Sequence, residues 1–264
     1  MDLGIAGRVA IVTGGSRGVG RGCAMALARE GANICICARR IEPLEETAEE
    51  IRKATGVEVL VVQADMESPE DIKRMVATVA EHFGRIDILV NNAANFAYGE
   101  DLGIGDEAWA HHFNVKFFGY LRTLREVAPH MQRNHWGRII NIGGGAARQV
   151  TGMGTSGPNN AAIVNMTKIM SDTLAKDGIT ANVVHPGAAD SDRRTLQIEF
   201  RAKQRGISLE DAEREIEANV PPIGRKVLSA DTGHMVAFLA SEGAAAVTGQ
   251  TISVDGGSNR QVIY

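Results

Sequence analysis

Tyrosine is scarce in this sequence of 264 residues, and long apolar runs are absent from it. The three tyrosines are Tyr98, Tyr120 and Tyr264, so residues 121–263 contain none. No run approaches the roughly 20 apolar residues that a membrane span needs. The first seven residues lack the basic and apolar pattern of a secretory signal. These absences argue against a membrane or secreted protein and predict a cytoplasmic one.

Cysteine and an excess of positive charge are also missing. The three cysteines, Cys23, Cys35 and Cys37, are too few and too clustered for a disulfide framework. A strand would place Cys35 and Cys37 on one face, as small buried hydrophobic residues. With 28 basic against 32 acidic residues the net charge is −4, so no basic field favours nucleic acid. We expect a small-molecule substrate as the partner, and neither nucleic acid nor membrane.

Glycine, by contrast, is abundant. The 30 glycines exceed the roughly 18 that average usage predicts, and they follow no collagen period. They therefore belong in the turns of a globular protein. No linker or internal repeat divides the chain, and its length fits one large domain. We predict a single domain over residues 1–264.

Short apolar runs alternate with helix-length segments along the chain. The predicted strands are Arg8–Thr13, Asn33–Ala38, Val57–Gln63, Ile86–Asn91, Arg138–Ile142, Ile179–His185 and Thr251–Val254. Helical patterns cover Glu42–Ala54 and Ser68–His82, the second opening with an N-cap serine and a first-turn proline. This alternation predicts an α/β fold, a three-layer doubly wound parallel sheet of about seven strands.

One segment, residues 188–226, interrupts the alternation before the last predicted strand. It is dense in charge, as in Leu209–Glu217. A solvated amphipathic helix is one interpretation. A substrate lid is another, because the segment follows a strand on the ligand side of such a sheet. The two interpretations are compatible.

The strongest local pattern is Val9–Gly20, where a strand ending at Thr13 is followed by Gly14, Gly18 and Gly20 and then by a helix. Glycine allows the tight turn, the close approach of a pyrophosphate and the close packing of helix on strand. The phosphates then lie at the positive N-terminus of the helix. The strand before and the helix after are the context that such a motif requires. We predict a dinucleotide site, with a purely structural turn as the alternative.

Charge after the second predicted strand favours NADP(H) over NAD(H). An NAD site usually places an acidic residue there to bind the ribose 2′-hydroxyl. This chain has Arg39 and Arg40 instead, with no acid before Glu42, and Arg17 lies inside the glycine turn. Guanidinium groups suit a 2′-phosphate through charge-assisted contacts. The alternative is that these arginines merely point into solvent.

Further motifs follow in order, and together they resemble the short-chain dehydrogenase/reductase family over nearly the whole chain. They are Thr13-Gly14-x-x-x-Gly18-x-Gly20, Asp65, Asn91-Asn92-Ala93-Ala94, Asn114, Pro186-Gly187 with Ser191 after it, Thr248-Gly249-Gln250 and Val254-Asp255-Gly256-Gly257. Ala94 and Ser191 depart from the usual Gly and Thr. The resemblance implies a Rossmann fold and an Asn114 that orders a catalytic water. It also implies a homodimer or homotetramer, with the Ala161–Lys176 helix in an interface.

The resemblance implies a cofactor site as well. Its expected members are Gly14, Ser16, Arg17, Gly18, Val19, Gly20, Arg39, Arg40, Asp65, Met66, Asn92, Ala93, Pro186 and Gly187.

The family's catalytic Ser, Tyr and Lys have no counterparts in the expected places. The register follows from two matches to the family, the predicted strand Arg138–Ile142 and the helical segment Ala161–Lys168. This register puts Ser156 at the tyrosine position and Asn160 at the lysine position, four residues apart on one helix face. The serine position falls at Gly143 or Gly144. No shift restores the pair, because no lysine lies between residues 116 and 168. Ser156 is thus a candidate donor and Asn160 a neutral ribose partner, although Ser156 before Pro158 is also an ordinary N-cap.

Other residues are candidates for the missing proton donor. Tyr98 follows the Asn91–Ala94 loop, with simple packing beside Phe96 as the alternative. His185 precedes the Pro186-Gly187 turn and has the right pKa range, but a strand-end histidine is more often only hydrogen-bonded. Asp190 and Asp192 are weaker candidates. His111 and His112 lack metal-ligand spacing, so we interpret them as structural and expect no metal site.

Two functions remain in contention. The first is an atypical NADP(H)-dependent oxidoreductase that transfers hydride to or from a carbonyl or an activated C=C bond. Reduction of a C=C bond tolerates loss of the tyrosine better than ketone reduction does. The second is an inactive NADP(H)-binding protein, a sensor or a structural subunit, with a non-redox lyase or isomerase as a further variant. Loss of an acid–base group alone typically costs about 10²–10⁴-fold in rate, which keeps the second function open.

Overall fold

The computed structural model describes residues 2–95, 103–149, 154–187, 193–218 and 220–259. Seven strands form one sheet: β1 (Val9–Thr13), β2 (Asn33–Ala38), β3 (Val59–Gln63), β4 (Ile88–Asn91), β5 (Gly137–Ile142), β6 (Ile179–Pro186) and β7 (Thr251–Val254). All neighbouring pairs are parallel, in the order β3-β2-β1-β4-β5-β6-β7. Tyr98 and residues 188–192 lie outside the described residues.

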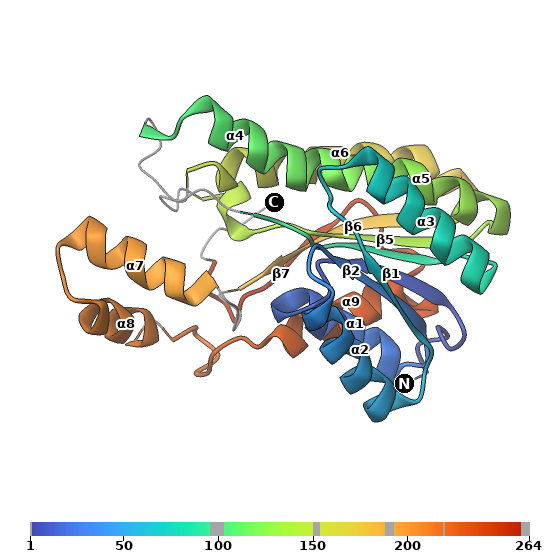
Figure 1. The fold of residues 1–264 in the computed structure, drawn as a ribbon, viewed down its shortest axis with the longest axis horizontal. Coiled ribbons are helices and arrows are strands. Elements are labelled where there is room, and N and C mark those ends of the chain that lie inside the picture. Colours follow the sequence, from blue (N-terminus) through green and yellow to red (C-terminus); the bar gives the residue numbers. More distant parts are fainter. Residues whose placement is uncertain (1, 96–102, 150–153, 188–192, 219, 260–264) are drawn as a thin grey trace.

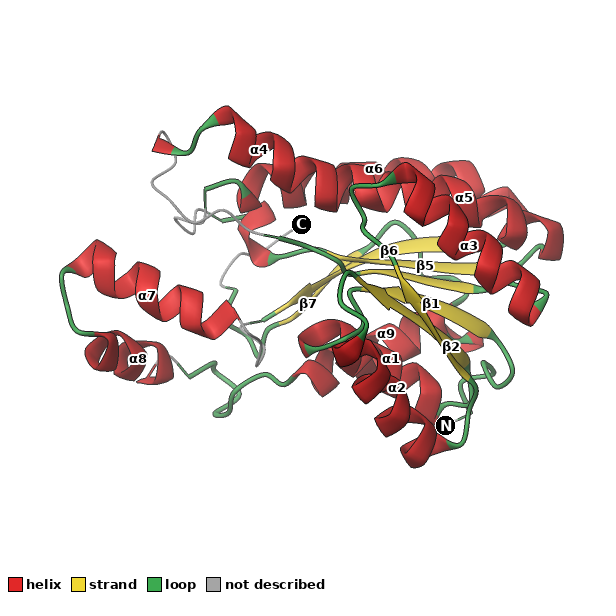
Figure 2. Cartoon of the chain, viewed as in Figure 1, coloured by secondary structure: helices red, strands yellow, loops and turns green. Residues whose placement is uncertain are grey.

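Helices cover both faces of the sheet, as Figures 1 and 2 show. The helices along the chain are α1 (Gly18–Arg29), α2 (Glu42–Thr55), α3 (Pro69–Phe83), α4 (Asp106–Phe113), α5 (Gly119–Asn134), α6 (Ser156–Leu174), α7 (Arg193–Arg205), α8 (Leu209–Ala218) and α9 (Ser229–Ala240), of which α7 and α8 lie beyond the end of the sheet. A π-helix, η2 (Asn114–Phe118), joins α4 to α5, and short 3₁₀ turns are η3 (Gly145–Ala147), η4 (Ala175–Asp177) and η5 (Glu242–Ala244). The predicted three-layer α/β architecture is confirmed.

Two apolar cores lie on the two faces of the sheet. One joins the strands to α1, α2 and α9, and the other joins them to α3 and α5. Cys35 and Cys37 share the second core, where burial raises the pKa of the Cys37 thiol to about 12. Their interpretation as buried hydrophobic residues is confirmed. No described helix is long and apolar enough to cross a membrane.

The predicted element boundaries differ from the observed ones by one or two residues. The strand predicted from Val57 begins at Val59, and the one predicted from Ile86 begins at Ile88. Val57 and Ile86 are apolar but precede the strands that the structure has, so composition alone places both strand starts too early. The predicted N-cap of α3 is confirmed, since Ser68 Oγ accepts a hydrogen bond from the Asp71 amide at 3.1 Å.

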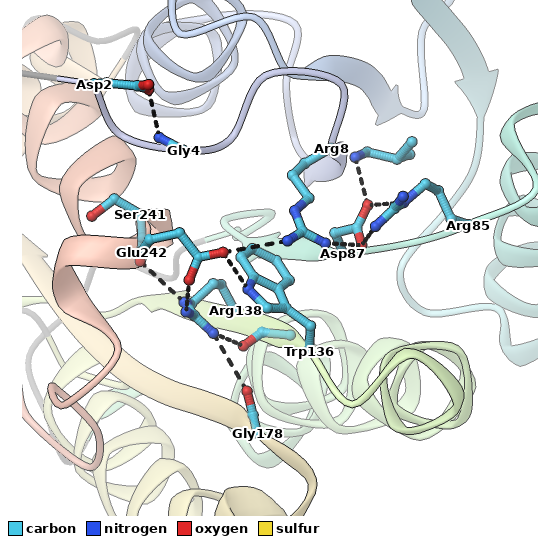
Figure 3. Close-up of polar contacts among 12 residues, drawn as sticks. Asp2, Gly4, Arg8, Arg85, Asp87, Trp136, Arg138, Gly178, Ser241 and Glu242 are labelled. Atoms are coloured by element: carbon cyan, nitrogen blue, oxygen red, sulfur yellow. Dashed lines mark hydrogen bonds and ion pairs between the residues drawn. The ribbon is translucent and has the colours of Figure 1, made fainter.

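A polar cluster closes the amino ends of the central strands, as Figure 3 shows. Asp87 is fully buried and accepts from the amide of Val9 at 2.9 Å and from the guanidinium of Arg85 at 2.7 Å. Arg8 lies 3.9 Å above the Trp136 ring and contacts Asp87 at 3.5 Å. These contacts tie β1, β4 and β5 together at the edge opposite the carboxyl ends.

Candidate active site

The glycine turn between β1 and α1 has the geometry that its sequence predicts. Gly14 and Gly18 have φ values of +65° and +53°, which favour glycine. A Cβ on Gly20 would lie 2.2 Å from the backbone oxygen of Gly14. Strand and helix therefore approach too closely for any side chain at that position.

The carboxyl ends of β1 and β4 are joined by Asn92. Its Nδ2 atom donates to the backbone oxygens of Thr13 and Gly14, both at 3.0 Å. The hydroxyl of Thr13 in turn accepts from the amides of Asn92 and Ala93. Strand order reverses between β1 and β4, and ligands of doubly wound sheets bind at such a switch point.

The N-terminus of α1 fits a bound phosphate. Its N-cap residue, Arg17, makes no side-chain cap, and its first turn contains no acidic residue. The first turns of α2 and α3 do contain acids, and Ser68 caps α3. The uncapped amides and positive dipole of α1 therefore suit an anionic ligand.

Basic side chains gather beside this turn. Arg17, Arg39 and Arg40 are all exposed. The amides of Gly14 and Gly15 donate to the oxygen of Cys37, so the ends of β1 and β2 are adjacent. The predicted adenine-side residues Asp65 and Met66 follow β3, the next strand in the sheet.

The glycines after β5 make room for a histidine. A Cβ on Gly143 would lie 2.5 Å from Nδ1 of His185, which is 1% exposed at the end of β6. Neither ring nitrogen of His185 has a hydrogen-bond partner among the described residues. Burial, followed by the charges of Arg148 and Lys116, lowers the pKa of His185 to about 4, so the ring is neutral at neutral pH. The predicted Pro186-Gly187 turn comes directly after His185, and the amide of Gly187 donates to the backbone oxygen of Val254 at 2.8 Å.

Helix α6 carries Ser156 and Asn160, which the sequence analysis predicts at the positions of the family's tyrosine and lysine. Ser156 and Asn160 are both buried, with 3% of each exposed. The N-cap position belongs to Thr155, and the Ser156 hydroxyl has no hydrogen-bond partner among the described residues. The interpretation of Ser156 as an N-cap is therefore wrong, because the helix begins at that residue rather than after it.

Lys116 reaches Asn160 from another helix. It lies in η2, is 3% exposed, and its Nζ donates to Oδ1 of Asn160 at 2.7 Å. Sequence reasoning missed it because 44 residues separate the pair. The available signal was a lysine close to the aromatic residues Phe113, Phe117 and Phe118.

Asn114 is not brought to this cluster. Its Nδ2 donates to Glu67 at 3.1 Å, and its Oδ1 accepts from Arg122 at 2.8 Å. These three residues line a groove of about 460 Å³ on the outside of η2. Residues two apart on a helix point in nearly opposite directions, so Lys116 faces inward where Asn114 faces outward.

The two histidines of α4 have structural contacts. His111 hydrogen-bonds to Glu67 at 2.8 Å, and buried His112 hydrogen-bonds to Thr155 at 2.6 Å. No three His, Cys, Asp or Glu side chains of the described residues are grouped to hold a metal ion. The other proton-donor candidates, Tyr98, Asp190 and Asp192, lie with Ser191 outside the described residues.

The fold and the glycine turn are those of a nucleotide-binding protein, and the comparisons with known proteins show its family. A family model described as enoyl-(acyl carrier protein) reductase matches residues 14–259. A putative ketoacyl reductase of Streptomyces coelicolor is 37% identical over 254 residues, which are 94% of this chain and 96% of the relative. The NADPH-dependent reductase BacG of Bacillus subtilis is 33% identical over 97% of this chain and 99% of its own. The chain belongs to the short-chain dehydrogenase/reductase family.

Solved structures agree with this assignment. L-sorbose reductase from Gluconobacter frateurii, complexed with NADPH and L-sorbose, superposes with a TM-score of 0.91 at 30% identity. The match covers 99% of this chain and all of that one.

Proposed function

We propose that this chain is an NADP(H)-dependent oxidoreductase that acts without the usual Tyr/Lys pair. Its reaction moves hydride between the nicotinamide and a carbonyl or activated C=C substrate. The observation that carries the proposal is the cluster on α6. The buried hydroxyl of Ser156 has no hydrogen-bond partner in the part of the chain that the structure describes, and Asn160 accepts from the ammonium of Lys116.

The cofactor is NADP(H). Arg17, Arg39 and Arg40 supply positive charge beside the glycine turn, and no acid takes the place that a 2′-hydroxyl would need. The uncapped α1 N-terminus would hold the pyrophosphate. The relative BacG is named as NADPH-dependent, and L-sorbose reductase binds NADPH.

The chemistry divides between cofactor and protein. When bound, NADPH supplies a hydride, which carries two electrons to the substrate carbon. The displaced π pair passes to oxygen, directly or through a conjugated C=C bond, and a proton from the medium completes the product. Ser156 donates a hydrogen bond to the substrate oxygen in this proposal, without giving up its proton. His185 presents a neutral ring, which donates from one nitrogen and accepts at the other.

An enone therefore suits this site better than a ketone. In an enone the carbonyl needs only to be polarised, and the proton is added at carbon in a later step. In a ketone the proton must reach the oxygen as its negative charge develops, and a serine hydroxyl is a poor acid.

A panel assay tests the proposal. The decay of NADPH absorbance is followed with ketones, enones and quinones, and turnover is expected fastest with enones. If no substrate turns over while NADPH binds tightly in a titration, the chain is instead a cofactor-binding protein without turnover. That second function is favoured by the neutral Asn160 at the expected lysine position.

Cofactor choice has its own test. Arg40→Ala is expected to weaken NADPH binding about 10-fold or more, because one charge-assisted contact to the 2′-phosphate is lost. NADH lacks that phosphate, so its binding should be unchanged. Lys53→Met is the control, since Lys53 lies on the exposed side of α2 and pairs with Glu49. Equal binding of NADPH and NADH by the unmodified protein contradicts the assignment.

Two further features belong to the proposal. Residues 188–226 act as a substrate lid, since α7 and α8 lie side by side beyond the end of β6 in Figure 1. The chain forms a homodimer or homotetramer through α6, whose Ile169 is 53% exposed. Light scattering that returns a monomer mass contradicts the second point.

A further inference from the structure

His185 is a buried polar side chain at the carboxyl end of β6. It is 1% exposed, and neither ring nitrogen has a hydrogen-bond partner among the described residues. Buried polar atoms are nearly always paired, because an unpaired one has lost its water and gained nothing in return. A ligand oxygen can supply the missing partner, so this imidazole is a candidate ligand-binding group.

The pairing of β5 with β6 decides what the ring faces. The amide of Gly143 donates to the backbone oxygen of Val184 at 2.9 Å, which places Gly143 beside the backbone of His185. Side chains alternate along a strand, so His185 points to the same face of the sheet as Val183. Val183 packs in a cluster with Ile163, so this is the face that α6 covers.

Gly143 leaves the space that the ring fills. A Cβ on Gly143 would lie 2.5 Å from Nδ1 and 2.6 Å from Cε1 of His185, so this edge of the ring stands where a side chain from β5 would begin. A Cβ on Gly144 would lie 2.8 Å from Nδ2 of Asn160, so α6 fills the neighbouring space. The sequence predicts the family's serine at one of these two glycines, and the imidazole takes up the room that such a hydroxyl group would need.

The ring lies one residue below the surface of the candidate site. Gly143 and His185 are both buried, whereas the residues that follow them, Gly144 and Pro186, are partly exposed. Both strands thus reach the surface directly after this pair, at the carboxyl end of the sheet where ligands of such folds bind. The buried hydroxyl of Ser156, at the start of α6, also has no partner in the part of the chain that the structure describes.

The ring is neutral at neutral pH. Burial, followed by the charges of Arg148 and Lys116, lowers the pKa of His185 to about 4, and Asp255 opposes this shift. A neutral imidazole has one N–H donor and one acceptor nitrogen. It can therefore polarise a bound oxygen with a hydrogen bond, although it is not a source of protons.

We propose that His185 donates a hydrogen bond from β6 to the carbonyl oxygen of the substrate, as a second donor beside the hydroxyl of Ser156. The inference rests on the proposed function, in which a carbonyl or enone accepts the hydride. A carbonyl oxygen has two lone pairs and accepts both bonds, which strengthen as the π pair reaches the oxygen. The proton of His185 stays on its ring nitrogen throughout.

Two variants of His185 separate the hydrogen bond from the packing. His185→Leu fills the space without a donor, so kcat/KM with the fastest substrate of the panel should fall about 10²-fold, while the Kd for NADPH is unchanged. His185→Gln retains an N–H donor and should keep at least about tenfold more activity than His185→Leu. His82→Leu is the matched control, since His82 lies at the exposed end of α3 and pairs with Glu58. Equal kcat/KM in the two His185 variants, or no loss in His185→Leu, overturns the proposal.

Nuclear magnetic resonance of the unmodified protein gives a readout that needs no turnover. With isotope-labelled histidine, the ring nitrogen signals of His185 are those that His185→Leu lacks. Each ketone and enone of the panel is added to the complex with NADP⁺, which has no hydride to transfer, and at least one should move these signals. If none does, the proposal is overturned. If one moves them but no compound turns over with NADPH, the oxidoreductase proposal fails and the binding role of His185 stands.

Discussion

Introducing a serine at Gly143 is expected to destabilise the protein, although the family places a serine near this position. The added Cβ would lie 2.5 Å from Nδ1 and 2.6 Å from Cε1 of His185, and 2.9 Å from Cγ1 of Val183. Both neighbours are at most 1% exposed on β6, which pairs with β5 and β7. The ring therefore has no open space to move into.

The size of the effect follows from the packing. Overpacking a filled core typically costs about 1–3 kcal/mol, and we expect about 2 kcal/mol for Gly143→Ser. No backbone strain adds to this, because Gly143 does not have a positive φ. Gly144→Ser should cost less, because the nearest atom there is the end of the Asn160 side chain at 2.8 Å.

Urea unfolding of a double-mutant cycle measures the clash directly. His185→Ala removes the ring, so the double variant with Gly143→Ser should cost at least about 1 kcal/mol less than the sum of the single variants. Additivity within about 0.5 kcal/mol, or a Gly143→Ser variant as stable as the unmodified protein, refutes the reasoning.

Three other predictions follow from the same structure. Burial lowers the pKa of His185 to about 4 from an ordinary 6.5, so between these pH values the unfolded chain binds more protons than the folded one. The free energy of unfolding therefore falls by up to roughly 3 kcal/mol as the pH is lowered through this range. In urea unfolding at several pH values, His185→Gln should lose this part of the pH dependence, and an unchanged pH dependence contradicts the assignment. Gly20→Ala places a Cβ 2.2 Å from the backbone oxygen of Gly14, so the turn that would hold the phosphates must shift, and titration should show NADPH binding weakened at least about tenfold. Gly103→Ala is the control and should bind NADPH normally, because its Cβ would meet nothing within 4 Å. Asp87→Ala leaves the buried amide of Val9 without its acceptor and removes the ion pair with the partly exposed Arg85. It should lower the free energy of unfolding by about 2 kcal/mol, which thermal melts would detect.

Much of the fold was predictable because its signals are local. Apolar runs bounded by glycine or polar residues marked the strands, and Ser68 marked the start of α3. The glycine turn was equally readable, since Gly14, Gly18 and Gly20 each meet a steric requirement within a few residues. Element ends were less certain, because an apolar residue does not reveal whether its amide is paired with a neighbouring strand.

The candidate site was only partly predictable, because its contacts join distant segments. Alignment drew attention to Ser156 and Asn160, but it did not reveal that Ser156 lies inside the helix rather than at its cap. It also directed attention to Asn114, whereas the structure brings Lys116 to α6 instead. A π turn changes which side chains face inward, and no periodic pattern in the sequence announces it.

The sequence by itself determined the parallel sheet, the nucleotide turn and the scarcity of tyrosine that directed attention to the proton donor. Strand periodicity and the steric freedom of glycine are properties of neighbouring residues, and they can be read along the chain. Only the tertiary structure decided that the ring of His185 lies over Gly143 and that the ammonium of Lys116 meets Asn160. Those contacts depend on how η2, β6 and α6 pack together, and packing across tens of residues leaves no local signal in the sequence.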